Sequence, residues 1–133
     1  MGLVHELALF EKSPNEVSNT AQQMLNDGFG ERPLFDCIVA EIDSKVVGFA
    51  LYYYRYSTWK GKCLYLEDFY VTETCRSKGI GKTLFEDIIK ISKKESCKRI
   101  NWQVLDWNQG AIKFYSKHSA SFDKAWWNGF INL

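Results

Sequence analysis

The sequence contains little proline, no closely paired cysteines and no long apolar run. Two prolines among 133 residues, together with 16% aromatic residues, argue against disorder. The four cysteines form no CxxC pair, which argues against a disulfide scaffold or a zinc site and favours the reducing cytoplasm. No segment approaches the roughly 20 apolar residues of a membrane-spanning helix, and residues 3–10 lack the basic flank of a secretory signal. We therefore expect one cytoplasmic domain over residues 1–133, with no bound metal and no membrane partner.

The net charge of +1 hides an uneven distribution. Residues 1–75 carry 6 basic and 11 acidic side chains, whereas residues 76–99 carry 8 basic and 3 acidic ones. Such a charge distribution suits a molecule that binds a polyanion and a cation together. The alternative is that the acidic and basic residues form two ordinary solvated faces. The basic block contains one aromatic residue, Phe85, and no series of aromatic residues interleaved with its charges, so it predicts no binding of nucleic acid.

Hydrophobic periodicity predicts a mixed sheet with helices packed on it. Two strand-like runs flank a turn at residues 43–45 and predict a hairpin. Ile80, Leu84, Ile88 and Ile91 recur at helical spacing and predict an amphipathic helix that starts near Gly79. Hairpins followed by a strand–helix–strand unit are typical of an α/β or α+β fold with a mixed sheet. The other expected helices are 3–12, 19–26 (ended by Gly28) and 109–118, and the expected strands are 37–40, 46–54, 63–72, 100–105 and 125–133.

The sharpest local signal is the segment 76–82, RSKGIGK, between a strand and the amphipathic helix. Glycines let the backbone approach a ligand closely, and the unpaired amides of a helix N-terminus suit phosphate oxygens. The alternative is a tight turn with solvated lysines. Two nucleotide-binding templates fail, because a Walker loop needs a glycine where Arg76 stands and a dinucleotide fingerprint needs one where Leu84 stands.

This segment matches the R/Q-x-x-G-x-G/A loop of the GCN5-related N-acetyltransferases (GNAT), which binds the pyrophosphate of coenzyme A. Other segments resemble the spermidine/spermine (diamine) N-acetyltransferase subfamily: Glu11 after an apolar helix, DGFGE at 27–31, VGFA at 47–50, LYLEDF at 64–69, Trp107-Asn108 and Phe114-Tyr115. The resemblance spans nearly the whole chain. It implies the acyl-CoA N-acyltransferase fold, here without the usual first strand and the start of the first helix. A sister group that acetylates thialysine shares these motifs, so the identity of the amine stays open.

The resemblance also implies acetyl-CoA as co-substrate and a set of residues that hold it. In the family, the strand before the loop binds the acetyl carbonyl and pantetheine through its backbone, the loop holds the pyrophosphate, and the next helix start flanks the pantetheine arm. The implied cofactor-binding residues are Phe69, Tyr70, Val71, Arg76, Ser77, Lys78, Gly79, Ile80, Gly81, Lys82, Asn108 and Ala111.

Direct attack on the thioester needs an uncharged amine, whereas a primary amine has a pKa near ~10.4. Glu67 lies just before the cofactor segment and is expected to take the proton, directly or through water. The alternative for Glu67 is a salt-bridging carboxylate. Asp68 should point to the opposite face of the strand and serve the structure. Tyr115 matches the family's general acid, which protonates the leaving thiolate, and its alternative is a packed core tyrosine.

Aromatic and acidic side chains line the amine site that the resemblance implies. Phe10 and Glu11 match a Tyr-Glu pair of the family, Trp59 lies in a turn where the family also has an aromatic residue, and Glu67 faces the substrate. Such walls suit a flexible dication through charge and cation–π attraction. For each residue, ordinary packing or a solvated charge is the alternative.

Two departures from the family bear on the substrate. SKHSA at 116–120 replaces the usual Arg-Arg-Gly-Ala, and Asp123 alone remains of an acidic cluster, which favours an amine smaller than spermidine. The predicted function is N-acetylation of a small diamine or polyamine by a homodimer that associates through the tail with Trp126 and Trp127. Two alternatives stay open: a non-catalytic module that binds coenzyme A, and an acetyltransferase of protein lysines or N-termini.

Overall fold

Three antiparallel strands and a short parallel fourth form the sheet, seen here in a computed structural model that describes residues 1–132. β1 (Asp36–Ile42) pairs with β2 (Lys45–Ser57), β2 pairs with β3 (Gly61–Val71), and β4 (Arg99–Asn101) runs parallel to β3. The predicted hairpin is confirmed, and both residues of its turn have the positive φ that a tight two-residue connection requires. The predicted α/β class with a mixed sheet is also confirmed.

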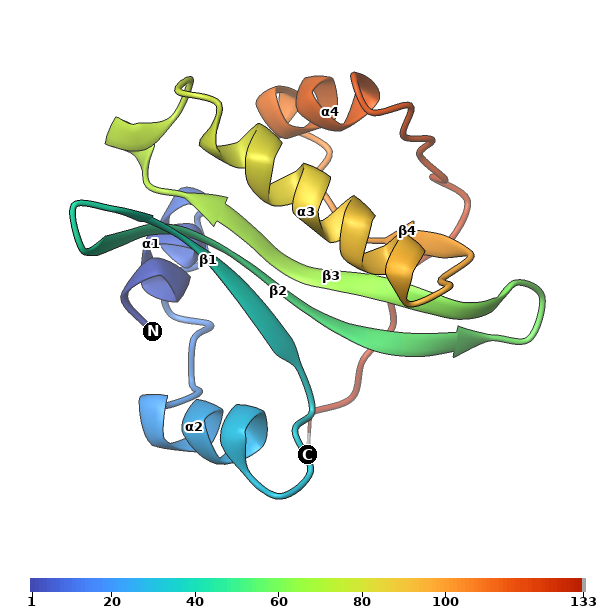
Figure 1. Ribbon diagram of the computed structural model, residues 1–133, viewed down its shortest axis with the longest axis horizontal. Helices are drawn as coiled ribbons and strands as arrows, with labels where there is room; N and C mark the ends of the chain where they lie inside the picture. Colours follow the sequence, from blue (N-terminus) through green and yellow to red (C-terminus); the bar gives the residue numbers. More distant parts are fainter. Residues whose placement is uncertain (133) are drawn as a thin grey trace. The chain divides into compact units, whose positions relative to one another are not determined.

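Helices pack on the two faces of this sheet (Figure 1). On one face, α1 (Gly2–Phe10) and α2 (Ala21–Phe29) supply partly buried side chains that pack against three buried strand residues, Phe49, Leu51 and Tyr70. On the other face lies α3 (Ile80–Lys94), which buries Leu84, Phe85, Ile88 and Ser92. Burying each large apolar side chain contributes about 1.5–3 kcal/mol, so both helical layers hold the sheet in place.

β3 changes its pairing halfway along its length. It is paired with β4 only over Cys63–Tyr65, and beyond Tyr65 its outer edge has no ladder partner among the described strands. On the β2 side, Leu51 lies opposite Asp68 but Tyr52 lies opposite Leu66, so Glu67 is the extra residue of a β-bulge. A bulge bends its strand, and β4 accordingly ends at Asn101 rather than continuing over the predicted 100–105.

Gly28 does not end the second helix, contrary to the prediction. α2 runs through it to Phe29, and Gly30 follows as the cap. A Cβ atom at Gly28 would lie 2.5 Å from Cζ of Phe35, one of the partly buried residues packed against the core. Glycine therefore fits this position because it leaves room for the Phe35 ring.

The chain divides into two compact units, Met1–Gln103, which holds every element described so far, and Val104–Leu133. The second unit contains α4 (Gln109–Ser116), which confirms the predicted helix. The strand predicted over 125–133 is wrong for residues 125–132, because none of the described strands pairs with them, and Leu133 lies outside the described residues. The single domain stays a prediction. None of the helices in residues 1–132 is long and apolar enough to cross a membrane.

Candidate active site

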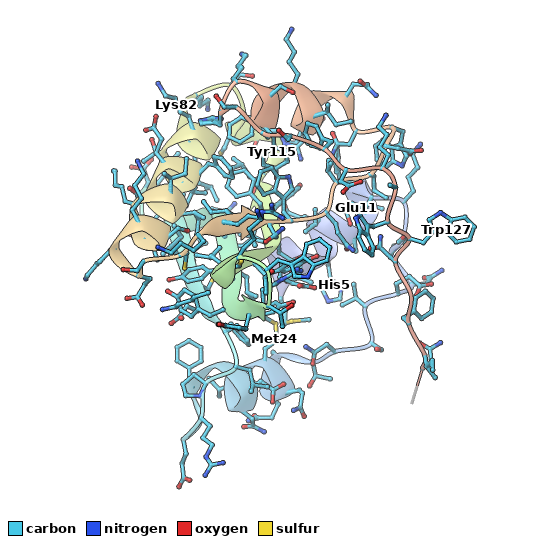
Figure 2. All side chains as sticks on the ribbon, turned by 90° about the vertical axis from the view of Figure 1, so that its right-hand side faces the viewer. His5, Glu11, Met24, Lys82, Tyr115 and Trp127 are labelled. Atoms are coloured by element: carbon cyan, nitrogen blue, oxygen red, sulfur yellow. The ribbon has the colours of Figure 1, made fainter. Side chains whose placement is uncertain are left out.

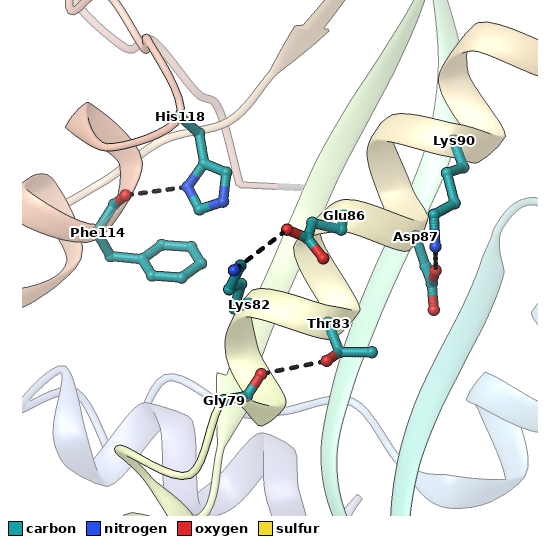
Figure 3. Close-up of polar contacts among 8 residues, drawn as sticks. All are labelled: Gly79, Lys82, Thr83, Glu86, Asp87, Lys90, Phe114 and His118. Atoms are coloured by element: carbon teal, nitrogen blue, oxygen red, sulfur yellow. Dashed lines mark hydrogen bonds and ion pairs between the residues drawn. The ribbon is translucent and has the colours of Figure 1, made fainter.

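The glycine loop leads directly into the first turn of α3 (Figure 3). Gly79 precedes the helix with φ of +82°, a left-handed conformation that side chains rarely adopt, and Ser77 has φ of +62°. Having no side chain, Gly79 cannot cap the first amides of α3, and its carbonyl accepts a hydrogen bond from the Thr83 hydroxyl at 3.3 Å. Lys78 and Lys82 are both exposed beside these amides. The loop thus combines uncapped N–H groups, a helix dipole and two cations, which together suit a phosphate.

The strand that enters this loop has no described strand beside its outer edge at residues 69–71. Phe69, Tyr70 and Val71 pair with β2 on one side, but they lie beyond the end of the described pairing with β4. The Phe69 ring meets the Phe85 ring of α3 at 5.8 Å, which fixes this end of β3 on the helix. The role of residues 69–71 in binding the cofactor stays a prediction.

Two carboxylates of β3 face the same side because of the bulge. Glu67 and Asp68 both line a cavity of ≈ 290 Å³ on the α1–α2 side of the sheet, with apolar walls that include Met24, Phe35 and Leu51. The prediction that Asp68 points to the opposite face from Glu67 is wrong, since the bulge interrupts the alternation of side chains. Burial and the charges of Glu67 and Glu11 raise the pKa of Asp68 to about 6. The cavity thus has an acidic end and an apolar body.

Two tyrosines, Tyr53 and Tyr65, lie beside Glu67, and no sequence motif points to them. Burial, the charge of Glu67 and a hydrogen bond to Glu67 raise the pKa of Tyr53. The Tyr53 ring lies 5.3 Å from the Tyr65 ring, and the Arg55 guanidinium lies 5.6 Å from the Tyr65 ring centroid. The sequence predicts only a strand for Tyr52–Tyr54, and the nearness of Tyr53 to Glu67 follows only once the register of β2 and β3 is known.

The predicted amine-binding residues are only partly brought together. Glu11 follows the last turn of α1 and lies close enough to act on the pKa of Asp68, and burial raises the pKa of Glu11 itself. Phe10 lies beside it and contacts Arg76. Trp59 is 83% exposed in the β2–β3 turn, and Glu67 lies six positions after Gly61 along β3, a distance of about 20 Å. Within one chain, a small amine at Glu67 does not reach Trp59.

The other predicted residues lie in the second unit. Asn108 caps α4, with its Oδ1 accepting from the Ala111 amide at 3.1 Å. Tyr115, in the last turn of α4, is 6% exposed, and its ring meets the Phe114 ring edge-on at 5.3 Å. His118, to which no catalytic role was assigned, has its Nδ1 3.1 Å from the Phe114 carbonyl oxygen (Figure 3). The catalytic role of Tyr115 stays a prediction.

Asp68→Asn is expected to stabilise the protein at neutral pH. Because the pKa of Asp68 is raised from 3.8 to about 6, the folded chain binds more protons than the unfolded chain between these values. The free energy of unfolding therefore falls as the pH rises through this window. Urea unfolding should show a gain for Asp68→Asn on the order of 1–3 kcal/mol at about pH 7.5 that fades as the pH falls toward 4. The exposed Asp36→Asn serves as the control, and an equal gain in both variants would contradict the assignment.

The glycine loop lies at the start of α3 on a mixed sheet, as the resemblance to the GNAT family predicts, and the family comparison agrees. The model of the acetyltransferase (GNAT) family matches residues 4–120 of the chain. The chain therefore belongs to the GNAT family, and it is an N-acetyltransferase enzyme, as the sequence predicted. GNAT acetyltransferases use acetyl-CoA as the acetyl donor.

Relatives of known name match most of this chain. It is 41% identical over 123 residues to mouse thialysine N-epsilon-acetyltransferase, covering 86% of this chain and 72% of the relative. It is 38% identical over 134 residues to human spermidine/spermine N(1)-acetyltransferase-like protein 1, covering 93% of this chain and 19% of that protein. An integron cassette protein from the mobile metagenome of V. cholerae has a similar structure, with a TM-score of 0.79, 26% identity and coverage of 99% and 83%. The predicted subfamily resemblance is confirmed.

Proposed function

We propose that this enzyme transfers the acetyl group of acetyl-CoA to a primary amine of a small diamine or polyamine, such as spermidine, a putrescine-like diamine or thialysine. The acidic cavity beside β3 carries the proposal, because the same strand then leads into the glycine loop. Carboxylates at one end suit an ammonium group, and apolar walls suit an aliphatic chain. The names of the mouse and human relatives, thialysine and spermidine/spermine acetyltransferases, support this substrate class.

Two side chains of the protein transfer protons in this proposal, and two others attract the amine. Glu67 takes a proton from the ammonium group, directly or through water, and its hydrogen bond with Tyr53 orients the carboxylate. Asp68 and Glu11 attract the cation to the cavity. Bound acetyl-CoA supplies a thioester that the free amine attacks directly, so no protein nucleophile is needed. Tyr115 donates a proton to the leaving thiolate.

The residues of the loop fit the pyrophosphate of coenzyme A. A Cβ placed on Gly79 would meet none of the described atoms within 4 Å, so this point of the loop is open to a ligand. We assign the pyrophosphate to Ser77, Lys78, Gly79, Ile80, Gly81 and Lys82, and the pantetheine arm to the backbone of Phe69, Tyr70 and Val71 and to Asn108 and Ala111. Charge and backbone amides would hold the phosphates, and strand-like hydrogen bonds would hold the arm.

We also infer a homodimer that associates through the tail. Trp126, Trp127, Phe130 and Ile131 are between 74% and 96% exposed, and Trp127 projects from the tail in Figure 2. Such a concentration of apolar surface favours burial against a second copy. Replacing Trp126 and Trp127 by serine should convert a dimer into a monomer in sedimentation velocity experiments. A wild-type chain that sediments as a monomer at all concentrations would contradict this inference.

The activity is tested by release of coenzyme A thiol with a panel of acceptors. The panel holds spermidine, putrescine, thialysine, lysine and a lysine-containing peptide, each with acetyl-CoA. We expect turnover of a free diamine or thialysine to exceed that of the peptide. Turnover of the peptide alone would indicate a protein acetyltransferase. Binding of coenzyme A without thiol release for any amine would indicate a non-catalytic module.

A further inference from the structure

Arg76 opens the glycine loop, yet its side chain is engaged with the protein. Its Nε donates a hydrogen bond to the Val71 carbonyl oxygen at 2.9 Å. Its Cζ lies 4.7 Å from the ring centroid of Phe10 and 5.2 Å from that of Tyr70. Arginine suits this place because its planar group stacks on aromatic faces while its edge donates hydrogen bonds. The guanidinium thereby joins the last turn of α1 to the end of β3.

A second contact joins the same two segments. Glu6 accepts a hydrogen bond from the Thr72 hydroxyl at 3.0 Å. Burial raises the pKa of the Tyr70 hydroxyl, and this hydroxyl is hydrogen-bonded to both Glu6 and Arg76. Glu6 and Phe10 are four residues apart, so they lie on one face of α1. That face is turned toward residues 70–76.

We propose that Arg76 is a positioning residue that holds α1, and with it Glu11, in a fixed place relative to the start of the glycine loop. The phosphate charge is then met by the exposed Lys78 and Lys82 and by the N-terminus of α3. This assignment differs from the pyrophosphate-binding role that the sequence suggested for Arg76. It rests on the proposed function, since α1 leads to the amine side of the site and the loop to the cofactor side.

An acetyl donor that lacks phosphates distinguishes a positioning role of Arg76 from a role in binding the pyrophosphate. With Arg76→Gln, we expect kcat/KM to fall on the order of tenfold to a hundredfold with both acetyl-CoA and S-acetylpantetheine, and the KM for the amine to rise with both donors. The matched control, Lys78→Gln, should impair turnover of acetyl-CoA only. A loss for Arg76→Gln that is confined to acetyl-CoA, or no loss at all, would overturn the proposal.

Arg76→Lys tests whether charge alone is sufficient. Lysine keeps the charge but loses the planar group and the Nε donor, so we expect it to behave like Arg76→Gln with both donors. Wild-type activity in Arg76→Lys would overturn the proposal. A loss of folded protein alone would lower kcat and leave the KM for the amine unchanged, which also counts against a positioning role.

Amide hydrogen exchange tests the positioning role independently of activity. In the chain without ligand, Arg76→Lys should increase exchange in α1 residues 5–10 as well as in the loop, whereas Lys78→Gln should leave α1 unchanged. Unchanged exchange in α1 of Arg76→Lys would overturn the proposal. If the wild-type chain acetylates no amine with either donor, the proposed function fails, and the exchange experiment still decides the role of Arg76.

Discussion

Replacing Tyr115 by phenylalanine should lower kcat for amine acetylation by about 10²–10⁴-fold. The change removes one hydroxyl group from a side chain that is 6% exposed, and the ring keeps its contact with Phe114. The fold should therefore be preserved, while the leaving thiolate loses its proton donor. The KM for acetyl-CoA should change by less than about threefold, because the hydroxyl acts on the developing thiolate rather than on the bound donor. Steady-state kinetics with the preferred amine would measure both constants.

Tyr56→Phe provides the matched control, since it removes the same atom from an exposed tyrosine near the far end of β2. It should leave kcat and thermal stability unchanged. Equal activity of Tyr115→Phe and Tyr56→Phe would show that Tyr115 is a packed core residue with no role in catalysis. That outcome is the alternative that the sequence left open.

Glu67→Gln should lower kcat/KM for the amine by about 10²–10⁴-fold at neutral pH. The amide keeps the size of the side chain but cannot accept the proton of the ammonium group. The neutral fraction of an amine with a pKa near ~10.4 rises about tenfold per pH unit, so the variant should recover activity steeply with pH. A pH–rate profile of both enzymes between about pH 7 and 10 measures this convergence.

Glu41→Gln, on the exposed part of β1, is the control for Glu67→Gln. Its profile should follow that of the wild type. A constant ratio between Glu67→Gln and wild type across the whole pH range would show that Glu67 binds the amine without taking its proton. Unchanged activity would remove Glu67 from the site altogether.

The parts of the fold that depend on local sequence were predicted well. The spacing of Ile80, Leu84 and Ile88 gives the amphipathic face of α3, and the hairpin and the glycine loop come from short-range turn chemistry. The errors depend on partners distant in the chain. Gly28 is predicted to stop a helix, but glycine is needed there because the Phe35 ring packs against it. β4 is predicted to reach residue 105, but it ends at Asn101, where its pairing with β3 ends.

The candidate site shows the same division. Glu67 was identified because it precedes the cofactor segment, whereas the position of Asp68 was mispredicted from simple alternation. The contribution of Tyr53 requires the register between β2 and β3, which a single strand does not reveal. Arg76 was assigned to the phosphate from its motif position, and its contacts with Phe10 and Tyr70 appear only after folding.

The bulge at Glu67 limits how this strand can evolve. Removing one residue between Leu66 and Phe69 would restore regular alternation and leave a single carboxylate opposite Leu51, so the cavity on the α1–α2 side would lose half of its acidic pair. Exchanges of side chain at Glu67 or Asp68 alter chemistry while the backbone path is kept. Homologous enzymes should therefore differ here by substitution, and changes of length should be confined to the surface turns such as that at Trp59.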